Sequence, residues 1–296
     1  MLEALIEAGD FEIQTVYTMP DKPTGRKQEL QKSPVKILAE KHKLKIKQPT
    51  SLKNLQSSIF NLQLNIVCDY GLIIPENILN TPTYGSINIH PSLLPKYRGA
   101  TPIQSTLING ELETGVSVML MDEKMDHGPI LAQKTIEIDI EDNYTSLHEK
   151  LAKTAKNLLP ETIFGYLAGE ITPKTQNHSE ATFCKEFKKE DGKINWDKSA
   201  LEIYNQWRGM IEWPGVWTEL KSKRLKIIKL KLTELFAHSY ELDQGEIKVD
   251  KDKIFVGCGD KKLIEIQELQ LEGKKVMGAK EFINGNQNLD KATLSS

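Results

Sequence analysis

The sequence has few of the features that mark secreted or metal-binding proteins. Its three cysteines, Cys68, Cys184 and Cys258, are odd in number and far apart, which fits neither a disulfide framework nor a C-x-x-C metal motif. The six histidines form no H-x-H or H-E-x-x-H pattern, so we expect no metal site. A reducing compartment, the cytoplasm, is the simplest location for such a chain.

The sequence also lacks long apolar runs and a strong charge of either sign. No Lys or Arg precedes Lys22 and the apolar segments are short, so we expect neither a signal peptide nor a membrane span. The formal net charge of −2 argues against a protein that coats nucleic acid, although a local basic surface is compatible with it. No G-x-G-x-x-G motif follows a strand pattern, which argues against a dinucleotide-dependent oxidoreductase.

The composition that is present is that of a globular protein with two domains. With 39% hydrophobic and 27% charged residues, the 296-residue chain is long enough for two cores. Strand and helix patterns alternate over residues 1–171, which predicts an α/β domain with a Rossmann-like, mostly parallel sheet. Residues 172–192 are rich in loop formers and charges, which predicts a linker. Five short strand patterns within residues 193–296 predict a small OB-like β-barrel, followed by a disordered tail after about residue 285.

The most informative pattern is a short alternation of apolar and polar residues that contains Asn88 and His90. Residues i and i+2 of a strand share a face, so these two side chains point the same way while Ile87 and Ile89 point the other way. Pro91 ends the strand, which places the polar pair where open parallel sheets gather reactive groups. An amide donor beside an imidazole suits chemistry on a carbonyl group, although a polar pair with a purely structural role is the alternative.

A carboxylate joins this pair from further along the chain. A predicted strand over residues 115–122 leads into a loop that carries Asp126, whose carboxylate is a candidate third member of a constellation with Asn88 and His90. His127 follows Asp126 directly, and because adjacent loop residues diverge we expect His127 at the surface.

Several segments, in matching order and spacing, resemble the folate-dependent formyltransferases. They are residues 88–90 (NIH), 92–95 (SLLP), 97–104 (YRGATPIQ), 113–116 (ETGV) and 121–128 (MDEKMDHG). Further segments resemble the members of that family that act on charged initiator tRNA. They are residues 19–26 (MPDKPTGR), 33–36 (SPVK), Trp196, 213–217 (WPGVW) and 273–275 (GKK). The resemblance runs from Met1 to about residue 282.

The resemblance implies a reaction and the residues that perform it. It implies transfer of a formyl group from 10-formyltetrahydrofolate to the α-amino group of methionine on initiator tRNA, for translation initiation. The reaction passes through a tetrahedral oxyanion, for which Asn88 and His90 are the expected donors. Asp126 is expected to act with His90, holding the imidazole and accepting or relaying a proton, without a metal.

The resemblance also implies where the substrates bind. The turn formed by Ser92, Leu93, Leu94 and Pro95 becomes the folate-binding turn, since a flat pterin ring needs a dry slot with a few hydrogen bonds. The turn at residues 70–75 is expected to line the same slot, and Asp69 departs from the small apolar residue usual in the family. Arg26, in the loop that matches the family's substrate loop, is expected to reach the acceptor end of tRNA.

A basic stretch in the predicted barrel is a second candidate for contact with tRNA. Six cations and no acid lie within residues 221–231: Lys221, Lys223, Arg224, Lys226, Lys229 and Lys231. A solvated face is the plain interpretation of such a run. On a barrel attached to a formyltransferase, we expect that Lys223, Arg224 and Lys226 contact RNA phosphates.

The start of the sequence differs from the resembled family. Residues 1–9 have the spacing of a helix, without the strand and Gly-Thr-Pro turn that precede this helix in the family. Because that strand is central in the fold, we expect a truncated or misassigned start. Restoring about 15 to 20 upstream residues would then raise stability and activity, since a central strand bonds two neighbours and fills core on both faces.

Two other functions stay open at this point. The chemistry can be the same with another acceptor, such as an amino sugar nucleotide or a purine precursor, against which the 19–36 loop and the basic stretch argue. The chain can also be a noncatalytic RNA-binding relative, against which the intact Asn88, His90 and Asp126 set argues. Whatever its function, we expect the chain to be a monomer that binds no membrane.

Overall fold

The structure is a computed structural model of the chain, and it describes residues 1–24, 29–53, 62–236, 242–286 and 288–295. The chain divides into two compact units. The N-terminal unit comprises Met1–Gly99, Glu113–Ile136 and Glu149–Phe183, and the C-terminal unit comprises Ala100–Leu112, Glu137–His148 and Cys184–Ser296. The domain boundaries expected at residues 171 and 193 stay predictions.

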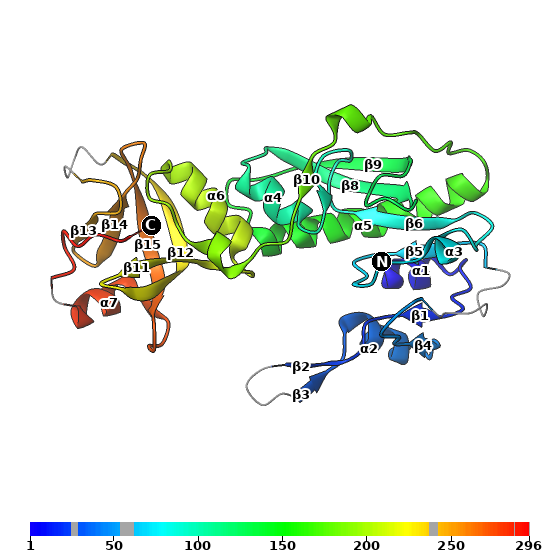
Figure 1. Cartoon of the computed structure of the whole chain (residues 1–296), viewed down its shortest axis with the longest axis horizontal. Helices are drawn as coiled ribbons and strands as arrows, with labels where there is room; N and C mark the ends of the chain where they lie inside the picture. Colours follow the sequence, from blue (N-terminus) through cyan, green and yellow to red (C-terminus); the bar gives the residue numbers. More distant parts are fainter. Residues whose placement is uncertain (25–28, 54–61, 237–241, 287, 296) are drawn as a thin grey trace. The chain divides into compact units, whose positions relative to one another are not determined.

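The N-terminal unit contains a four-stranded sheet with the strand order β5-β6-β8-β9 (Figure 1). Its strands are β5 (Asn65–Val67), β6 (Ser86–His90), β8 (Glu113–Leu120) and β9 (Ile130–Glu137). β5 runs parallel to β6, whereas β8 runs antiparallel to it. Sheets that mix parallel and antiparallel strands are common in α/β folds, and the predicted α/β class is confirmed.

A parallel pair of short strands, β1 and β4, forms a separate sheet. β1 covers only Val16–Tyr17, and its ladder with β4 contains two residue pairs. The other elements of the N-terminal unit are α1 (Leu2–Ala8), β2 (Lys22–Thr24), β3 (Glu29–Gln31), α2 (Pro34–Lys41), β4 (Ile46–Lys47), α3 (Glu76–Leu79), β7 (Arg98–Gly99) and the 3-10 helix η1 (His178–Glu180).

Helix boundaries in this unit follow local sequence signals. α1 ends at Gly9, whose φ of 76° lies in the left-handed region that glycine adopts without strain. α2 begins with a proline after Ser33, whose side chain accepts a hydrogen bond from the backbone N–H of Lys36. In the long helix α5 (Tyr144–Leu167), every fourth residue from Leu151 to Ile163 is buried, the spacing of a core-facing helix stripe.

An antiparallel sheet with the order β11-β12-β15-β14-β13 forms the body of the C-terminal unit. Its strands are β11 (Val216–Leu220), β12 (Lys223–Phe236), β15 (Lys262–Leu271), β14 (Lys253–Gly257) and β13 (Ile247–Asp250), with β16 (Met277–Gly278) paired to β15. The unit also contains α4 (Pro102–Ile108), the short strand β10 (Phe183–Cys184), the 3-10 helix η2 (Lys189–Gly192), α6 (Ala200–Met210) and α7 (Ala279–Gly285). Trp196 and Phe282, each 1% exposed, belong to its core.

The C-terminal tail is ordered, which corrects the expectation of disorder after residue 285. Leu289 and Leu294 are buried in the core of the C-terminal unit. Ser295 forms backbone hydrogen bonds with Glu219 of β11, and Ala292 accepts one from Ile247 of β13. The tail therefore bonds to both edge strands of the sheet, and closing the edges in this way is characteristic of a barrel.

None of the helices within the described ranges is long and apolar enough to cross a membrane. The same described residues contain no group of three or more His, Cys, Asp or Glu side chains that could hold a metal ion.

Candidate active site

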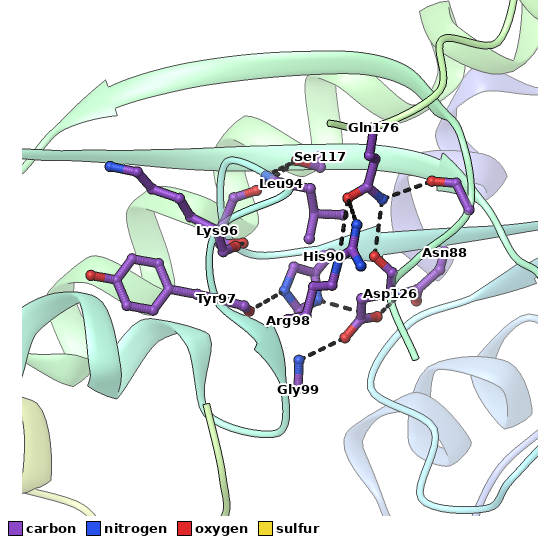
Figure 2. A network of polar contacts seen from close by, with 12 residues as sticks. Asn88, His90, Leu94, Lys96, Tyr97, Arg98, Gly99, Ser117, Asp126 and Gln176 are labelled. Atoms are coloured by element: carbon purple, nitrogen blue, oxygen red, sulfur yellow. Dashed lines mark hydrogen bonds and ion pairs between the residues drawn. The ribbon is translucent and has the colours of Figure 1, made fainter. Parts of the chain in front are cut away.

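The end of β6 and the loop after β8 place the three expected catalytic side chains together (Figure 2). Asn88 Nδ2 donates a hydrogen bond to Asp126 Oδ1 at 3.4 Å. His90 Nδ1 lies 3.6 Å from the same oxygen, and the two side chains are 5% and 13% exposed. The backbone N–H of Gly99 donates to Asp126 Oδ2 at 2.8 Å. One carboxylate thus faces an amide, an imidazole and a backbone donor.

The ring of His90 has a defined tautomer. Its Nε2 lies 2.8 Å from the carbonyl oxygen of Tyr97. A carbonyl oxygen can only accept, so Nε2 carries the proton and donates. In a neutral imidazole the other nitrogen, Nδ1, then holds the lone pair, and this is the nitrogen that faces Asp126. Nδ1 is therefore the atom through which His90 can take up a proton.

The turn of Ser92, Leu93, Leu94 and Pro95 is attached to the neighbouring strands by two polar side chains, the buried Ser117 and the exposed Gln133. Ser117 Oγ of β8 donates to the Ser92 carbonyl oxygen at 2.6 Å and accepts from the Leu94 N–H at 3.0 Å. Gln133 Nε2 of β9 donates to the Leu94 carbonyl oxygen at 2.9 Å and to Ser117 Oγ at 2.8 Å. The turn is thus held at its backbone, two residues after His90.

The other expected wall of the folate slot, residues 70–75, has both apolar and polar features. Ile73 is 95% exposed, whereas Tyr70, Leu72 and Ile74 pack against a small core that contains Ile78. The buried hydroxyl of Tyr70 has no hydrogen-bond partner among the described residues, and burial raises its pKa. Asp69 is exposed and has a φ of 47°.

Arg26 lies outside the described residues, but the segment that leads into its loop is anchored. Lys36 of α2 forms an ion pair with Asp21 at 2.6 Å and donates to Gln48 at 2.8 Å. Gln48 in turn donates to Asp21 and to the carbonyl oxygen of Met19. Hydrogen bonds from Lys36 and Gln48 lower the pKa of Asp21.

The basic stretch on β12 lies beside β11, which carries Trp217. Lys223, Arg224 and Lys226 are exposed, and the guanidinium of Arg224 lies over the ring of Trp217 at 3.9 Å from its centre. Arg224 and Lys226 line a hollow of about 150 Å³ together with Lys189, Trp213 and Trp217. The structure therefore combines cations with exposed aromatic surface, a combination typical of nucleic-acid contacts.

Some residues around the site were not predicted from the sequence. Ser117 and Gln133 lie in strands whose patterns indicate only burial or alternation, so no local signal identifies their bonds to the 92–95 turn. Arg98 belongs to the YRG segment and Gln176 to the predicted linker, and neither pattern indicates a contact with the site. His127 is half-buried rather than a surface residue, because its ring stacks on His178 at 3.9 Å and its Nδ1 donates to Asp122 at 2.6 Å.

Comparison with known proteins identifies relatives over nearly the whole chain. The family model "Formyl transferase" matches residues 1–163, and "Formyl transferase, C-terminal domain" matches residues 186–287. A methionyl-tRNA formyltransferase of Thermodesulfovibrio yellowstonii is 45% identical over 98% of this chain and 94% of its own. A protein of the same name from Enterococcus faecalis is 40% identical over 96% of this chain and 91% of its own.

Solved structures share the fold at lower identity. An N-formyltransferase from Helicobacter canadensis, in complex with folinic acid and dTDP-3-aminofucose, superimposes with a TM-score of 0.66 at 23% identity. The match covers 90% of this chain and 93% of that chain. HypX from Aquifex aeolicus, in complex with tetrahydrofolic acid, has a TM-score of 0.58 at 16% identity over 75% of this chain and 38% of that chain. At these identities the likeness concerns the fold alone.

Proposed function

Because the chain belongs to the formyl transferase family, we propose that it transfers a formyl group from 10-formyltetrahydrofolate to the α-amino group of methionine on initiator tRNA. The relatives that cover nearly the full chain at 40 to 45% identity bear the name methionyl-tRNA formyltransferase. The observation that carries the proposal is the Asp126 carboxylate, which faces both Asn88 and His90 at the end of β6.

The reaction needs an oxyanion donor and a proton acceptor, and the proposed roles follow from the geometry. When the amine attacks the formyl carbon, a C–N bond forms and the carbonyl electrons move onto oxygen. The Asn88 amide has two N–H hydrogens and directs one of them at Asp126, which leaves the other for this oxygen. The amine must also lose a proton before the bond to the donor nitrogen breaks, and that nitrogen must gain one.

His90 and Asp126 are suited to this proton movement. Nδ1 of His90 holds a lone pair and faces a carboxylate oxygen, so a proton taken from the amine would lie between two groups that share it. The N–H of Gly99 and the carbonyl of Tyr97 fix the two side chains from their other sides. Both residues are therefore held beside the position at which the proton is taken up.

The substrate sites are proposed from the surrounding residues. The folate donor lies along the turn of Ser92, Leu93, Leu94 and Pro95, and residues 70–75 line the same slot. Arg26 contacts the acceptor end of the tRNA, and Lys223, Arg224 and Lys226 contact its phosphates. The enzyme works in the cytoplasm as a monomer.

A direct assay tests the proposal. The protein is incubated with 10-formyltetrahydrofolate and methionine-charged initiator tRNA, and formylmethionyl-tRNA is measured after deacylation. Parallel reactions contain a charged elongator tRNA, or an amino sugar nucleotide as the acceptor. Formylation of the initiator tRNA is the expected result, and formylation of the sugar alone would favour the other acceptor class. Sedimentation velocity measures whether the protein is a monomer.

A further inference from the structure

Gln176 holds the backbone of the loop that carries Asp126. Its side-chain nitrogen donates to the carbonyl oxygen of Asp126 at 2.9 Å and to that of Gly128 at 2.7 Å. Gln176 is only 5% exposed, although it lies in the segment that the sequence predicts to be a linker. Both hydrogens of its amide are therefore used on one loop (Figure 2).

Arg98 fixes the orientation of that amide. Its Nε and Nη2 donate to Gln176 Oε1 at 3.2 and 2.6 Å, and Arg98 is 3% exposed. An arginine can only donate, so the amide must present its oxygen to Arg98 and its nitrogen to the loop. Arg98 immediately precedes Gly99, whose N–H bonds the Asp126 carboxylate. Arg98 thus supports the backbone of Asp126 through Gln176, and the adjacent Gly99 bonds the Asp126 side chain directly.

Polar contacts rather than apolar burial hold this loop in shape, and within it the N–H of Lys124 and the ring of His127 donate to Asp122. Residues 123–125 are exposed, and Met125 is 69% exposed, so apolar burial contributes little there. Asp126 itself has a φ of 49°, in the left-handed region that residues with a side chain seldom adopt. Such a conformation persists only where the surroundings determine it, and at Asp126 they are hydrogen bonds from Gln176, Gly99 and Asn88.

We propose that Gln176 and Arg98 are positioning residues for the reaction, which hold the Asp126 carboxylate against His90 and Asn88. The inference rests on the proposed function for its activity measurement. It assigns a role in the reaction to Gln176, which lies in the predicted linker of residues 172–192. It also gives Arg98 a role apart from any contact with substrate.

Gln176→Glu tests the proposal most directly, because glutamate keeps the size of the side chain and offers Arg98 an acceptor. It removes the two N–H donors and sets a carboxylate against the carbonyl oxygens of Asp126 and Gly128. We expect kcat to fall about 10- to 100-fold, with the KM values for donor and tRNA within about twofold, because misplacement by about 1 Å affects the transition state more than binding. Arg98→Lys keeps the charge but loses the paired donation from Nε and Nη2 to Gln176. We therefore expect a smaller fall in kcat for this variant.

The control and a second measurement separate positioning from folding and from the proposed function. Asn177→Ala changes the next residue, which is exposed and bonds only locally to Ser179 and Glu180, and it should leave kcat unchanged. Hydrogen exchange of the Gly99 amide reports whether Asp126 Oδ2 is still in place, whatever the activity. Faster exchange of Gly99 in Gln176→Glu and Arg98→Lys, but not in Asn177→Ala, is expected.

The outcomes are distinct. If Gly99 exchange or kcat in both Gln176→Glu and Arg98→Lys equals that of the parent protein, the positioning role is wrong. If the parent shows no formylation while Gly99 exchange accelerates in the variants, the proposed function fails and the structural part of the inference stands. If Gln176→Glu does not fold, Arg98→Lys alone decides by the same two measurements.

Discussion

His90 and Asp126 face each other through Nδ1 and Oδ1, which lie 3.6 Å apart with both side chains largely buried. The other imidazole nitrogen donates to the carbonyl of Tyr97, so the proton that matters for chemistry can reside only on the side of Asp126. Burial strengthens electrostatic interactions within the pair compared with water. In the proposed reaction this pair receives the proton that leaves the attacking amine.

Replacing Asn88, His90 or Asp126 by alanine should raise the activation barrier by about 2 to 4 kcal/mol each, the range for losing an oxyanion donor or an acid/base group. Single-turnover formylation with saturating donor and tRNA measures the effect, and equilibrium titration measures folate binding, which should change much less. Asp122→Asn is the matched control, because Asp122 bonds His127 in the same loop region. Near-normal turnover of any of the three alanine variants would remove that residue from the mechanism.

The sequence predicted those parts of the site that depend on local pattern. The alternation around Asn88 and His90 fixes their shared face, and β6 was found where the pattern placed it. Asp126 was found through its resemblance to a family motif. Gln176 and Arg98 could not be predicted in the same way, because their partners lie 50 and 78 residues away and depend on how the chain folds back on the sheet.

The same distinction explains the fold. α2 and α6 begin where Ser33 and Ser199 cap them, because capping is a local interaction. The tail after about residue 285 was expected to be disordered because chain termini are often poorly ordered. Its order depends on two leucines and on backbone bonds to strands far away in sequence, and composition does not reveal either.

Neutralising Lys223, Arg224 and Lys226 together should weaken tRNA binding and flatten its salt dependence, by roughly one unit of slope for each phosphate contact that is lost. Lys229 and Lys231 provide a matched control on the same strand. They lie opposite Glu268 and Glu265, so their charge is partly compensated and their neutralisation should change the slope less. Binding is measured by titration at several salt concentrations. Equal slopes for the parent and the triple variant would identify the basic stretch as a solvated face.

Acidification should destabilise the contacts among Arg98, Gln176 and His178, because it protonates His178. Partial desolvation, and then the nearby His127 and Arg98, lower the pKa of His178, whose Nδ1 must be unprotonated to accept from Arg98 Nη2 at 2.9 Å. The unfolded chain therefore takes up this proton first as the pH falls below about 6.5. Neutral His178 therefore contributes its full stabilisation above that pH. The contribution is lost as the pH falls through the pKa of His178 in the folded protein, which is the lower of the two.

The comparison for this prediction is His178→Gln, which keeps an acceptor but does not titrate. Urea unfolding followed by far-ultraviolet circular dichroism should show the parent losing stability relative to this variant between pH 7.5 and pH 5. His148→Gln, on helix α5, serves to control for histidine loss elsewhere. A difference between parent and His178→Gln that stays constant over this range would contradict the prediction.

Shortening the side chain of Leu294 should destabilise the C-terminal unit, because this residue fixes the tail across the edge of the sheet. Leu294 is 2% exposed, and its N–H donates to the carbonyl oxygen of Gly245 at 2.8 Å. Leu294→Ala should cost about 2 to 5 kcal/mol, the range for buried leucines that leave a cavity. Lys280→Ala is the control, since its ion pair with Asp252 is exposed and contributes little to stability.

Tryptophan fluorescence is a selective measurement for this prediction. All four tryptophans, at positions 196, 207, 213 and 217, belong to the C-terminal unit, so their signal reports its unfolding and not that of the N-terminal unit. The urea midpoint should fall clearly for Leu294→Ala and hardly at all for Lys280→Ala. If Leu294→Ala unfolds at the midpoint of the parent, the tail contributes no measurable stability and the sheet is held closed by its other strands.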